Sequence, residues 1–266
     1  MAAKRRLDAL LVERGLVESR SRAQALVMAG RVHVDGAPVT KAGTPTADDA
    51  AVEVISPPRF VSRGGEKLET ALAGLGVDVA GERCLDVGAS TGGFTDCLLQ
   101  HGAAEVVALD VGRNQLHERL RADPRVTVIE GTNARSLDCA ALPFRPGVVT
   151  ADVSFISLRL VLPAVLACAA EPWRALVLVK PQFEAGRADV RRGVVRYPEV
   201  RRRVLQDFAD FASRSGWAVL GVCDSCVPGP AGNREYVVYL ASPAHPLRKD
   251  QTADVADQIE RALAAS

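Results

Sequence analysis

Five short apolar segments recur at near-even spacing along the chain, and this recurrence constrains the fold more than any other sequence feature. The segments begin near Cys84, Val106, Val126, Val148 and Leu176. Helical patterns separate most of them, an alternation typical of a doubly wound parallel sheet in an α/β fold. Strand patterns at 217–222 and 236–240 would complete the sheet. A Pro- and Gly-rich turn joins these two, so the last strand could run antiparallel.

The first 56 residues follow a different pattern and predict a separate small domain. Two short helices are expected, the second with Ala25, Leu26 and Met28 facing inward. A hairpin follows at 31–39 around Asp-Gly, and a further strand at 51–55. We therefore predict three parts, which are a domain at 1–56, a linker at 57–65 that opens with two prolines, and a main domain at 66–266.

The N-terminal segment is basic, although the whole chain has a formal net charge of only +1. Residues 1–45 hold eight Lys/Arg and four Asp/Glu, so the segment nets +4. A second basic cluster runs from 187 to 203. Local clusters of positive charge attract phosphate groups more than the overall charge does. A merely solvated basic face is the equally weighted alternative.

A glycine-rich turn follows the first strand of the predicted sheet, in CLDVGASTGGF at 84–94. Such a turn brings backbone N–H groups and a helix N-terminus close to a ligand. Ser90 replaces the middle glycine of the dinucleotide fingerprint, which disfavours a pyrophosphate. Asp110 ends the second strand, where a carboxylate can accept both ribose hydroxyls of an adenosine. The pattern favours S-adenosylmethionine, with NAD as the alternative. The candidate cofactor-binding residues are Asp86, Gly88, Ser90, Gly92, Gly93, Phe94, Asp110 and Asn133.

Charged residues also stand at the ends of later strands. Asp152 and Lys180 follow two strands whose carboxyl ends are expected beside the glycine turn. Glu235 begins the last strand, and Lys67 precedes the first. Each residue alone is ordinary for a solvated strand end. Two lysines and two acids together suit the removal of a proton from a weakly acidic hydroxyl before methyl transfer, because a lysine beside other positive charge can accept a proton.

Long segments of the sequence resemble the TlyA family of rRNA 2′-O-methyltransferases, some members of which are called hemolysin A. Residues 4–56 are similar to an S4 RNA-binding domain through RLDALLVERG, SRSRAQALVMAGRVHVDG and KAGTP. Residues 60–240 are similar to FtsJ-like methyltransferases through VSRGGEKL, LDVGASTGGFTDCLL, LDVGRNQL, ADVSFISL, VLVKPQFE and GNREYVVYL. Thr91 departs from the usual Pro-Gly-Gly turn of the FtsJ-like proteins, as it does in TlyA members.

The resemblance implies a Rossmann-like, S-adenosylmethionine-dependent enzyme that methylates the ribose of cytidine in rRNA. The basic N-terminus and a C-terminal helix expected at 250–264 match the longer form of the family, which implies action on both ribosomal subunits. The family's catalytic tetrad falls on Lys67, Asp152, Lys180 and Glu235. Contacts to rRNA phosphates are expected from Arg6, Arg20, Arg22 and Lys41.

Three other functions stay open. The stretch Asp152–Phe155 is similar to the Asp-Pro-Pro-Tyr motif of amino-group methyltransferases, so methylation of a base ranks second. The other two are an RNA-binding assembly factor without catalysis and a membrane-active cytolysin. The cytolysin would need an insertion segment, and no run of about eighteen apolar residues occurs.

The cellular context is predicted to be cytoplasmic and reducing. The charged N-terminus lacks the apolar region of a secretory signal. The six cysteines are scattered and are expected to be reduced core residues. Cys223 and Cys226 have C-x-x-C spacing, but without a second ligand pair the spacing is interpreted as coincidence, and no metal site is expected.

Overall fold

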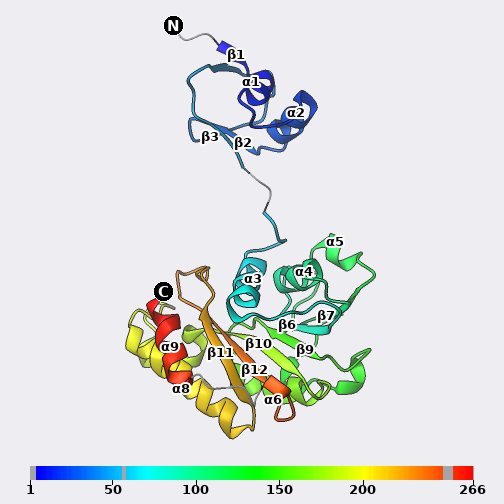
Figure 1. The fold of residues 1–266 in the computed structure, drawn as a ribbon, viewed down its shortest axis with the longest axis vertical. Helices are drawn as coiled ribbons and strands as arrows, with labels where there is room; N and C mark the ends of the chain where they lie inside the picture. The colour runs from blue at the N-terminus through cyan, green and yellow to red at the C-terminus, as the bar shows by residue number, and fades with distance from the viewer. Residues whose placement is uncertain (1–3, 56–57, 248–253, 266) are drawn as a thin grey trace. The chain divides into compact units, whose positions relative to one another are not determined.

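The computed structural model describes residues 4–55, 58–247 and 254–265, and the chain divides into two compact units. Unit 1 spans Met1–Arg59 and unit 2 spans Phe60–Ser266 (Figure 1). The structure differs from the predicted linker at 57–65, because Phe60 is buried in a core of unit 2 and helix α3 (Gly64–Leu75) begins within that range.

Unit 1 combines two helices with five short strands among the described residues. The elements are β1 (Lys4–Arg6), α1 (Leu7–Glu13), α2 (Arg20–Met28), β2 (Val32–Val34), β3 (Ala37–Val39), β4 (Pro45–Ala47) and β5 (Val52–Val54). Strand β2 pairs antiparallel with both β3 and β5, and β1 pairs with β4. The β2–β3 pair confirms the predicted hairpin.

The inward face of α2 differs from the prediction. Ala23 and Val27, which are one helical turn apart, are fully buried against α1 and β2. Ala25 and Met28 are exposed, and Leu26 is only partly buried. The prediction was wrong for Ala25 and Met28, whereas Leu26 does pack against this core. Apolar residues occur on more than one face of this helix, and the contact with α1 selects only one of them.

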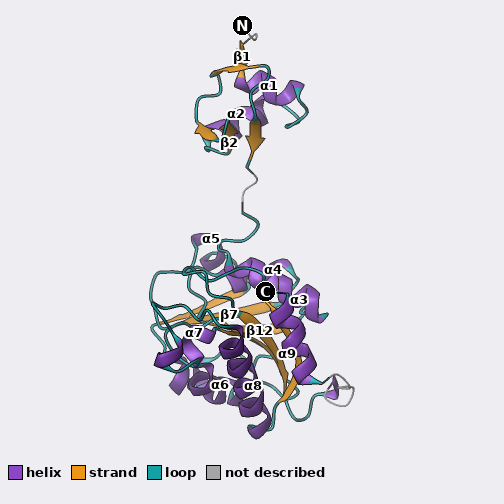
Figure 2. Cartoon of the chain, turned by 90° about the vertical axis from the view of Figure 1, so that its left-hand side faces the viewer, coloured by secondary structure: helices purple, strands orange, loops and turns teal. Residues whose placement is uncertain are grey.

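Unit 2 is a sheet of seven described strands between two layers of helices (Figures 1 and 2). The strands are β6 (Arg83–Val87), β7 (Glu105–Asp110), β8 (Val126–Glu130), β9 (Val148–Ala151), β10 (Arg174–Val179), β11 (Ala218–Asp224) and β12 (Tyr236–Ala241). They lie in the order β11-β12-β10-β9-β6-β7-β8, and only β12 runs antiparallel to its neighbours. All seven strand predictions are confirmed, including the antiparallel last strand.

Helices cover both faces of the sheet and create two apolar cores. The helices are α3, α4 (Gly93–Gln100), α5 (Glu118–Arg121), α6 (Leu158–Ala167), α7 (Pro181–Glu184), α8 (Pro198–Arg214) and α9 (Val255–Ala264). Cys84 packs in the core formed with α3 and α4, whereas the adjacent Leu85 packs in the core formed with α6, α8 and α9. This alternation is what a strand buried on both faces requires. Residues 250–253 of the predicted C-terminal helix lie outside the described residues.

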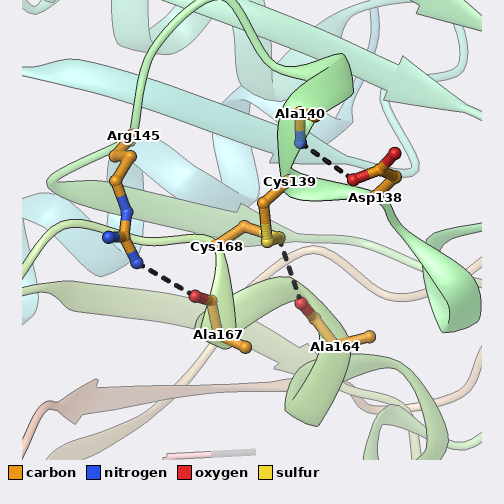
Figure 3. The surroundings of a disulfide bond; sticks show 7 residues. All are labelled: Asp138, Cys139, Ala140, Arg145, Ala164, Ala167 and Cys168. Carbon is orange, nitrogen blue, oxygen red and sulfur yellow. Dashed lines mark hydrogen bonds between the residues drawn. A yellow bond between two sulfur atoms is a disulfide. The ribbon is translucent and has the colours of Figure 1, made fainter.

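A disulfide joins Cys139 to Cys168, which corrects the prediction that all six cysteines are reduced (Figure 3). Cys139 begins a short 3-10 helix (Cys139–Ala141) and Cys168 follows the end of α6, and their Cα atoms lie 5.0 Å apart. The prediction failed because a separation of 29 residues carries no signal of this contact. Cys84, Cys97, Cys223 and Cys226 are free thiols.

Over the described residues, no helix has both the length and the apolar character needed to cross a membrane. In the same part of the chain, His, Cys, Asp and Glu side chains nowhere gather in a group of three that could hold a metal ion.

Candidate active site

The four residues of the predicted tetrad meet at one edge of the sheet in unit 2. Asp152 follows β9 and Lys180 follows β10, which are parallel neighbours. Glu235 immediately precedes β12, and because β12 is antiparallel, its first residue Tyr236 lies opposite Val179 at the end of β10. Lys67 reaches the same edge from α3 rather than from a strand.

The tetrad forms two ion pairs that line one small cavity. Lys67 Nζ lies 2.5 Å from Glu235 Oε2, and Lys180 Nζ lies 2.5 Å from Asp152 Oδ1. All four residues line a cavity of about 280 Å³, which we call the small cavity. The arrangement places two amines and two carboxylates around a space large enough for a sugar ring.

Burial makes these charges depend on each other. The side chain of Glu235 is 1% exposed, and those of Lys67 and Lys180 are 9% and 10% exposed. Removing one member of a buried pair leaves the other charge without compensation, which costs several kcal/mol, about 3–5. Within each pair, the lysine and the carboxylate therefore hold one another in a fixed geometry at the cavity wall.

Two further polar residues support the pairs, and the sequence analysis did not single them out. Lys180 Nζ donates to Ser154 Oγ at 2.8 Å, and Gln182 Nε2 donates to Glu235 Oε1 at 2.9 Å. Each lies two residues from a tetrad member in the sequence, within the segments ADVSFISL and VLVKPQFE. Proximity along the chain was the only available signal, since serine and glutamine at strand ends are common.

The loop that carries Asp152 and Ser154 is fastened by Glu184 of α7. The Glu184 carboxylate accepts hydrogen bonds from Ser157 Oγ at 2.6 Å and from the Leu158 backbone N–H at 2.7 Å. Burial raises the pKa of this carboxyl group, while these two donors oppose the rise. The bonds tie the start of α6 to the segment after Lys180, so both sides of the small cavity are held together.

A larger cavity of about 560 Å³ adjoins the small one, and we call it the large cavity. Of the predicted cofactor-binding residues, Gly88, Ser90, Asp110 and Asn133 line it. The two cavities share four residues, which are Gly88, Ser90, Asp152 and Ser154. A ligand in one cavity would therefore lie next to a ligand in the other.

The remaining predicted cofactor residues lie elsewhere. Gly93 and Phe94 line the small cavity, whereas Gly92 and Asp86 line neither cavity. Asp86 is fully buried beneath the turn and accepts hydrogen bonds from Thr95 Oγ1 at 2.7 Å and Thr150 Oγ1 at 3.1 Å. Burial raises its pKa to about 7. Asp86 therefore supports the turn from below and does not reach the cavity.

Gly88 shapes the boundary between the cavities. Its φ of 81° lies in the left-handed region, and a Cβ there would lie 2.5 Å from the carbonyl oxygen of Asp152. Only glycine lets the turn after β6 approach the end of β9 this closely.

Asp110 and Asn133 are both held in defined orientations at the wall of the large cavity. The Asp110 carboxylate accepts from the backbone N–H groups of Ser90 at 2.8 Å and Gly112 at 2.7 Å. Asn133 Oδ1 accepts from the Arg135 N–H at 3.0 Å. Each carboxylate oxygen keeps a further lone pair, so Asp110 can still accept from ligand hydroxyls.

An exposed aromatic residue stands beside both cavities. Phe155 is 90% exposed, has a φ of 64° and lines the large cavity. Its ring centroid lies 5.1 Å from that of Phe183, which follows Lys180 closely in sequence. A non-glycine residue held at positive φ with an exposed ring is uncommon and indicates a functional constraint.

In unit 1, two of the four residues predicted to contact RNA form ion pairs within the protein. Arg6 Nη2 and Arg20 Nη2 lie 3.0 and 3.2 Å from Oδ2 of Asp8, whose side chain is completely buried. The hydrogen bond from Arg6 is the main reason that the pKa of Asp8 lies far below its usual range. Arg22 and Lys41 are exposed, and neither has an ion-pair partner among the described residues.

Comparison with known proteins gives consistent matches over both units. The family model of the FtsJ-like methyltransferases matches residues 60–242, and that of the S4 domain matches residues 5–46. The chain is 50% identical over 243 residues to the 16S/23S rRNA (cytidine-2′-O)-methyltransferase TlyA of Mycobacterium tuberculosis, covering 90% of this chain and 91% of the relative. It is 41% identical to Hemolysin A of Brachyspira hyodysenteriae over 88% of this chain and 99% of the relative.

A solved structure supports the same relationship. A hemolysin-like protein of Streptococcus thermophilus aligns with a TM-score of 0.71 and 38% identity, covering 98% of this chain and 96% of that one.

Proposed function

This chain belongs to the FtsJ-like methyltransferases that carry an S4 domain, and from this premise we propose that it methylates the 2′-hydroxyl of cytidine in rRNA with S-adenosylmethionine as donor. The observation that carries the proposal is the arrangement of two lysine–carboxylate pairs in the small cavity, directly beside the large cavity. The cytidine substrate is inferred from the names of the relatives.

The residues of the large cavity fit S-adenosylmethionine. Gly88 lines the cavity where the turn after β6 meets the end of β9, and Asp110 lines it with carboxylate lone pairs for ribose hydroxyls. The Asn133 side chain, whose oxygen is already occupied, would present its amide nitrogen to adenine. When bound, S-adenosylmethionine supplies a methyl group activated by its sulfonium.

Lys180 is the group we assign to remove the proton from the 2′-hydroxyl. Its amine donates a hydrogen bond to Ser154 Oγ and forms an ion pair with Asp152, which restricts two of the three directions around the nitrogen. In the neutral amine, the lone pair then occupies the remaining direction and can accept the ribose proton. Lys67 and Glu235, held by Gln182, align the ribose and keep the cavity near electrical neutrality.

Both ribosomal subunits are the proposed substrates. The Mycobacterium tuberculosis relative is named for 16S and 23S rRNA, whereas a Campylobacter jejuni relative that is 35% identical over 68% of this chain is named for 23S rRNA alone. Incubating isolated subunits of each kind with methyl-labelled cofactor, followed by mapping of 2′-O-methyl groups, tests the proposal. Label on a base instead of a ribose would favour the amino-group alternative.

Asp110→Ala is expected to weaken S-adenosylmethionine binding by about 1–3 kcal/mol, roughly 5- to 150-fold, because the ribose hydroxyls lose their acceptor. Isothermal calorimetry measures the affinity directly. Glu105→Ala is the matched control, since Glu105 lies on the same strand at the opposite edge and pairs with Arg83. Equal affinity of the Asp110 variant and the wild type would remove Asp110 from the cofactor site.

Phe155→Ala is expected to weaken the interaction with rRNA by about 1–3 kcal/mol, because an exposed ring can stack on the base of the target nucleotide. The effect should appear in KM for the subunit, measured at saturating cofactor because Phe155 also lines the large cavity. Leu160→Ala serves as the control, because it also removes an exposed apolar side chain, here from α6. If both variants behave alike, Phe155 has no specific contact with the base.

A further inference from the structure

A loop of unit 2 presents three arginines to solvent without ion pairs. The segment 190–197, here called the arginine loop, contains Arg191, Arg192 and Arg196, all exposed. The described part of the chain offers none of them an ion-pair partner, whereas Arg202 pairs with Glu260 and Arg203 pairs with Asp189 nearby. The three exposed guanidinium groups therefore differ from Arg202 and Arg203 of α8, which are neutralised by their ion pairs.

The arginine loop is anchored although its charged side chains are exposed. Val195 is buried, and its backbone N–H donates to Asn233 Oδ1 at 3.0 Å. Asn233 Nδ2 in turn donates to the Gly193 carbonyl at 2.8 Å, and Arg191 bridges to Val194 across the turn. Asn233 is itself 3% exposed, so the loop is held from inside the protein.

The segment that contains Asn233 also forms part of the wall of the small cavity. The carbonyl of Asn233 accepts from the Gly229 N–H at 2.9 Å, and Pro230 lines the small cavity. Glu235 follows Asn233 by two residues, and a Cβ on Gly229 would lie 2.5 Å from Glu235 Oε1. The arginine loop and the catalytic carboxylate are thus fixed by one compact segment, 229–235.

We propose that the arginine loop is an rRNA-docking surface of unit 2 itself, which binds backbone phosphates flanking the target ribose. This inference rests on the proposed function and adds a contact outside the S4 domain. Arginine suits this role because its planar guanidinium pairs with phosphate oxygens in a bidentate manner. Tyr197, 48% exposed at the end of the loop, adds a ring next to these charges. Docking here would bind the RNA backbone next to the segment that carries Glu235.

The test replaces Arg191, Arg192 and Arg196 together by glutamine in the full-length protein. KM for the ribosomal subunit is expected to rise roughly tenfold, since several exposed charge contacts are lost at once. The slope of log binding constant against log salt should fall by about 2, as expected for three lost phosphate contacts. Cofactor affinity and turnover at saturating subunit concentration should stay at the wild-type level.

Arg214→Gln is the matched control, since Arg214 ends α8 and lies about 24 Å along the helix from Pro198, at about 1.5 Å per residue. A second variant with lysine at all three loop positions should retain most of the salt dependence. A triple glutamine variant with wild-type KM and salt slope overturns the inference. So does a variant that binds naked rRNA normally but binds subunits weakly, because the loop would then face a ribosomal protein.

The outcomes also separate this inference from the proposed function. If the wild-type protein transfers no methyl group to rRNA of either subunit, the proposed function fails. If the wild type is active and the loop variant matches it, only the docking surface fails.

Discussion

Lys180→Arg is expected to abolish most methyl transfer, by about a hundred- to ten-thousandfold in turnover, because a guanidinium does not release its proton in a protein. The substitution keeps the positive charge beside Asp152, so it separates a role as proton acceptor from a purely electrostatic role. Lys180→Ala should lose a similar factor. Single-turnover transfer to purified subunits, with cofactor bound in excess, measures the chemical step directly.

A binding control makes the Lys180 result decisive. Calorimetry with S-adenosylmethionine should give wild-type affinity for both variants, because Lys180 does not line the large cavity. An arginine variant with near-normal turnover would show that Lys180 acts only through its charge, and Asp152 would become the next candidate for the base.

Ser154→Ala offers a finer test of how Lys180 is oriented. Without Ser154 Oγ, the amine loses its hydrogen bond and keeps only the ion pair with Asp152, so its lone pair is no longer confined to one direction. Turnover should fall roughly tenfold, about the effect of one lost hydrogen bond to a charged group. Ser154→Thr, which keeps the hydroxyl, should recover most of the rate, and a failure of threonine to do so would argue for a steric role.

The strands of unit 2 could be predicted from the sequence because each is a short apolar run of its own. In a sheet buried on both faces, nearly every strand residue is apolar, so the runs stand out from the helices between them. The inward face of α2 could not be predicted in this way. Ala25 and Met28 are as apolar as Ala23 and Val27, and only the contact with α1 distinguishes them.

The tetrad was predictable from strand ends and from the family resemblance, but the partners that hold it were not. Ser154 and Gln182 act through hydrogen bonds to Lys180 and Glu235, and such bonds depend on which strands become neighbours. Asp86 shows a second limit of the sequence analysis, which assigned to the cofactor site a residue that does not reach it. The sequence places it beside the glycine turn, yet side chains alternate along β6, and Asp86 points to the face covered by α4, toward Thr95 and Thr150.

Deleting residues 1–59 is expected to lower kcat/KM for ribosomal subunits by about a hundred- to ten-thousandfold, the range typical for losing one of two linked binding modules. The cut is placed after Arg59 because Phe60 belongs to the core of unit 2. Both cavities lie entirely within unit 2, so the shortened protein should bind S-adenosylmethionine normally. Calorimetry on the truncated protein therefore reports both its folding and the integrity of the site.

A full-length variant with substitutions in unit 1 should reproduce part of this loss in kcat/KM while unit 1 stays in place. Arg6 and Arg20 are unsuitable, because replacing either would leave the buried Asp8 carboxylate poorly compensated and would disturb the fold of unit 1. Arg22→Glu combined with Lys41→Glu changes only exposed, unpaired positions, and the charge reversal should weaken binding to subunits and reduce its salt dependence. Arg214→Glu combined with Arg261→Glu makes the same change in net charge on exposed helix positions of unit 2. If this control weakens binding equally, net charge alone governs docking and unit 1 has no specific RNA-binding surface.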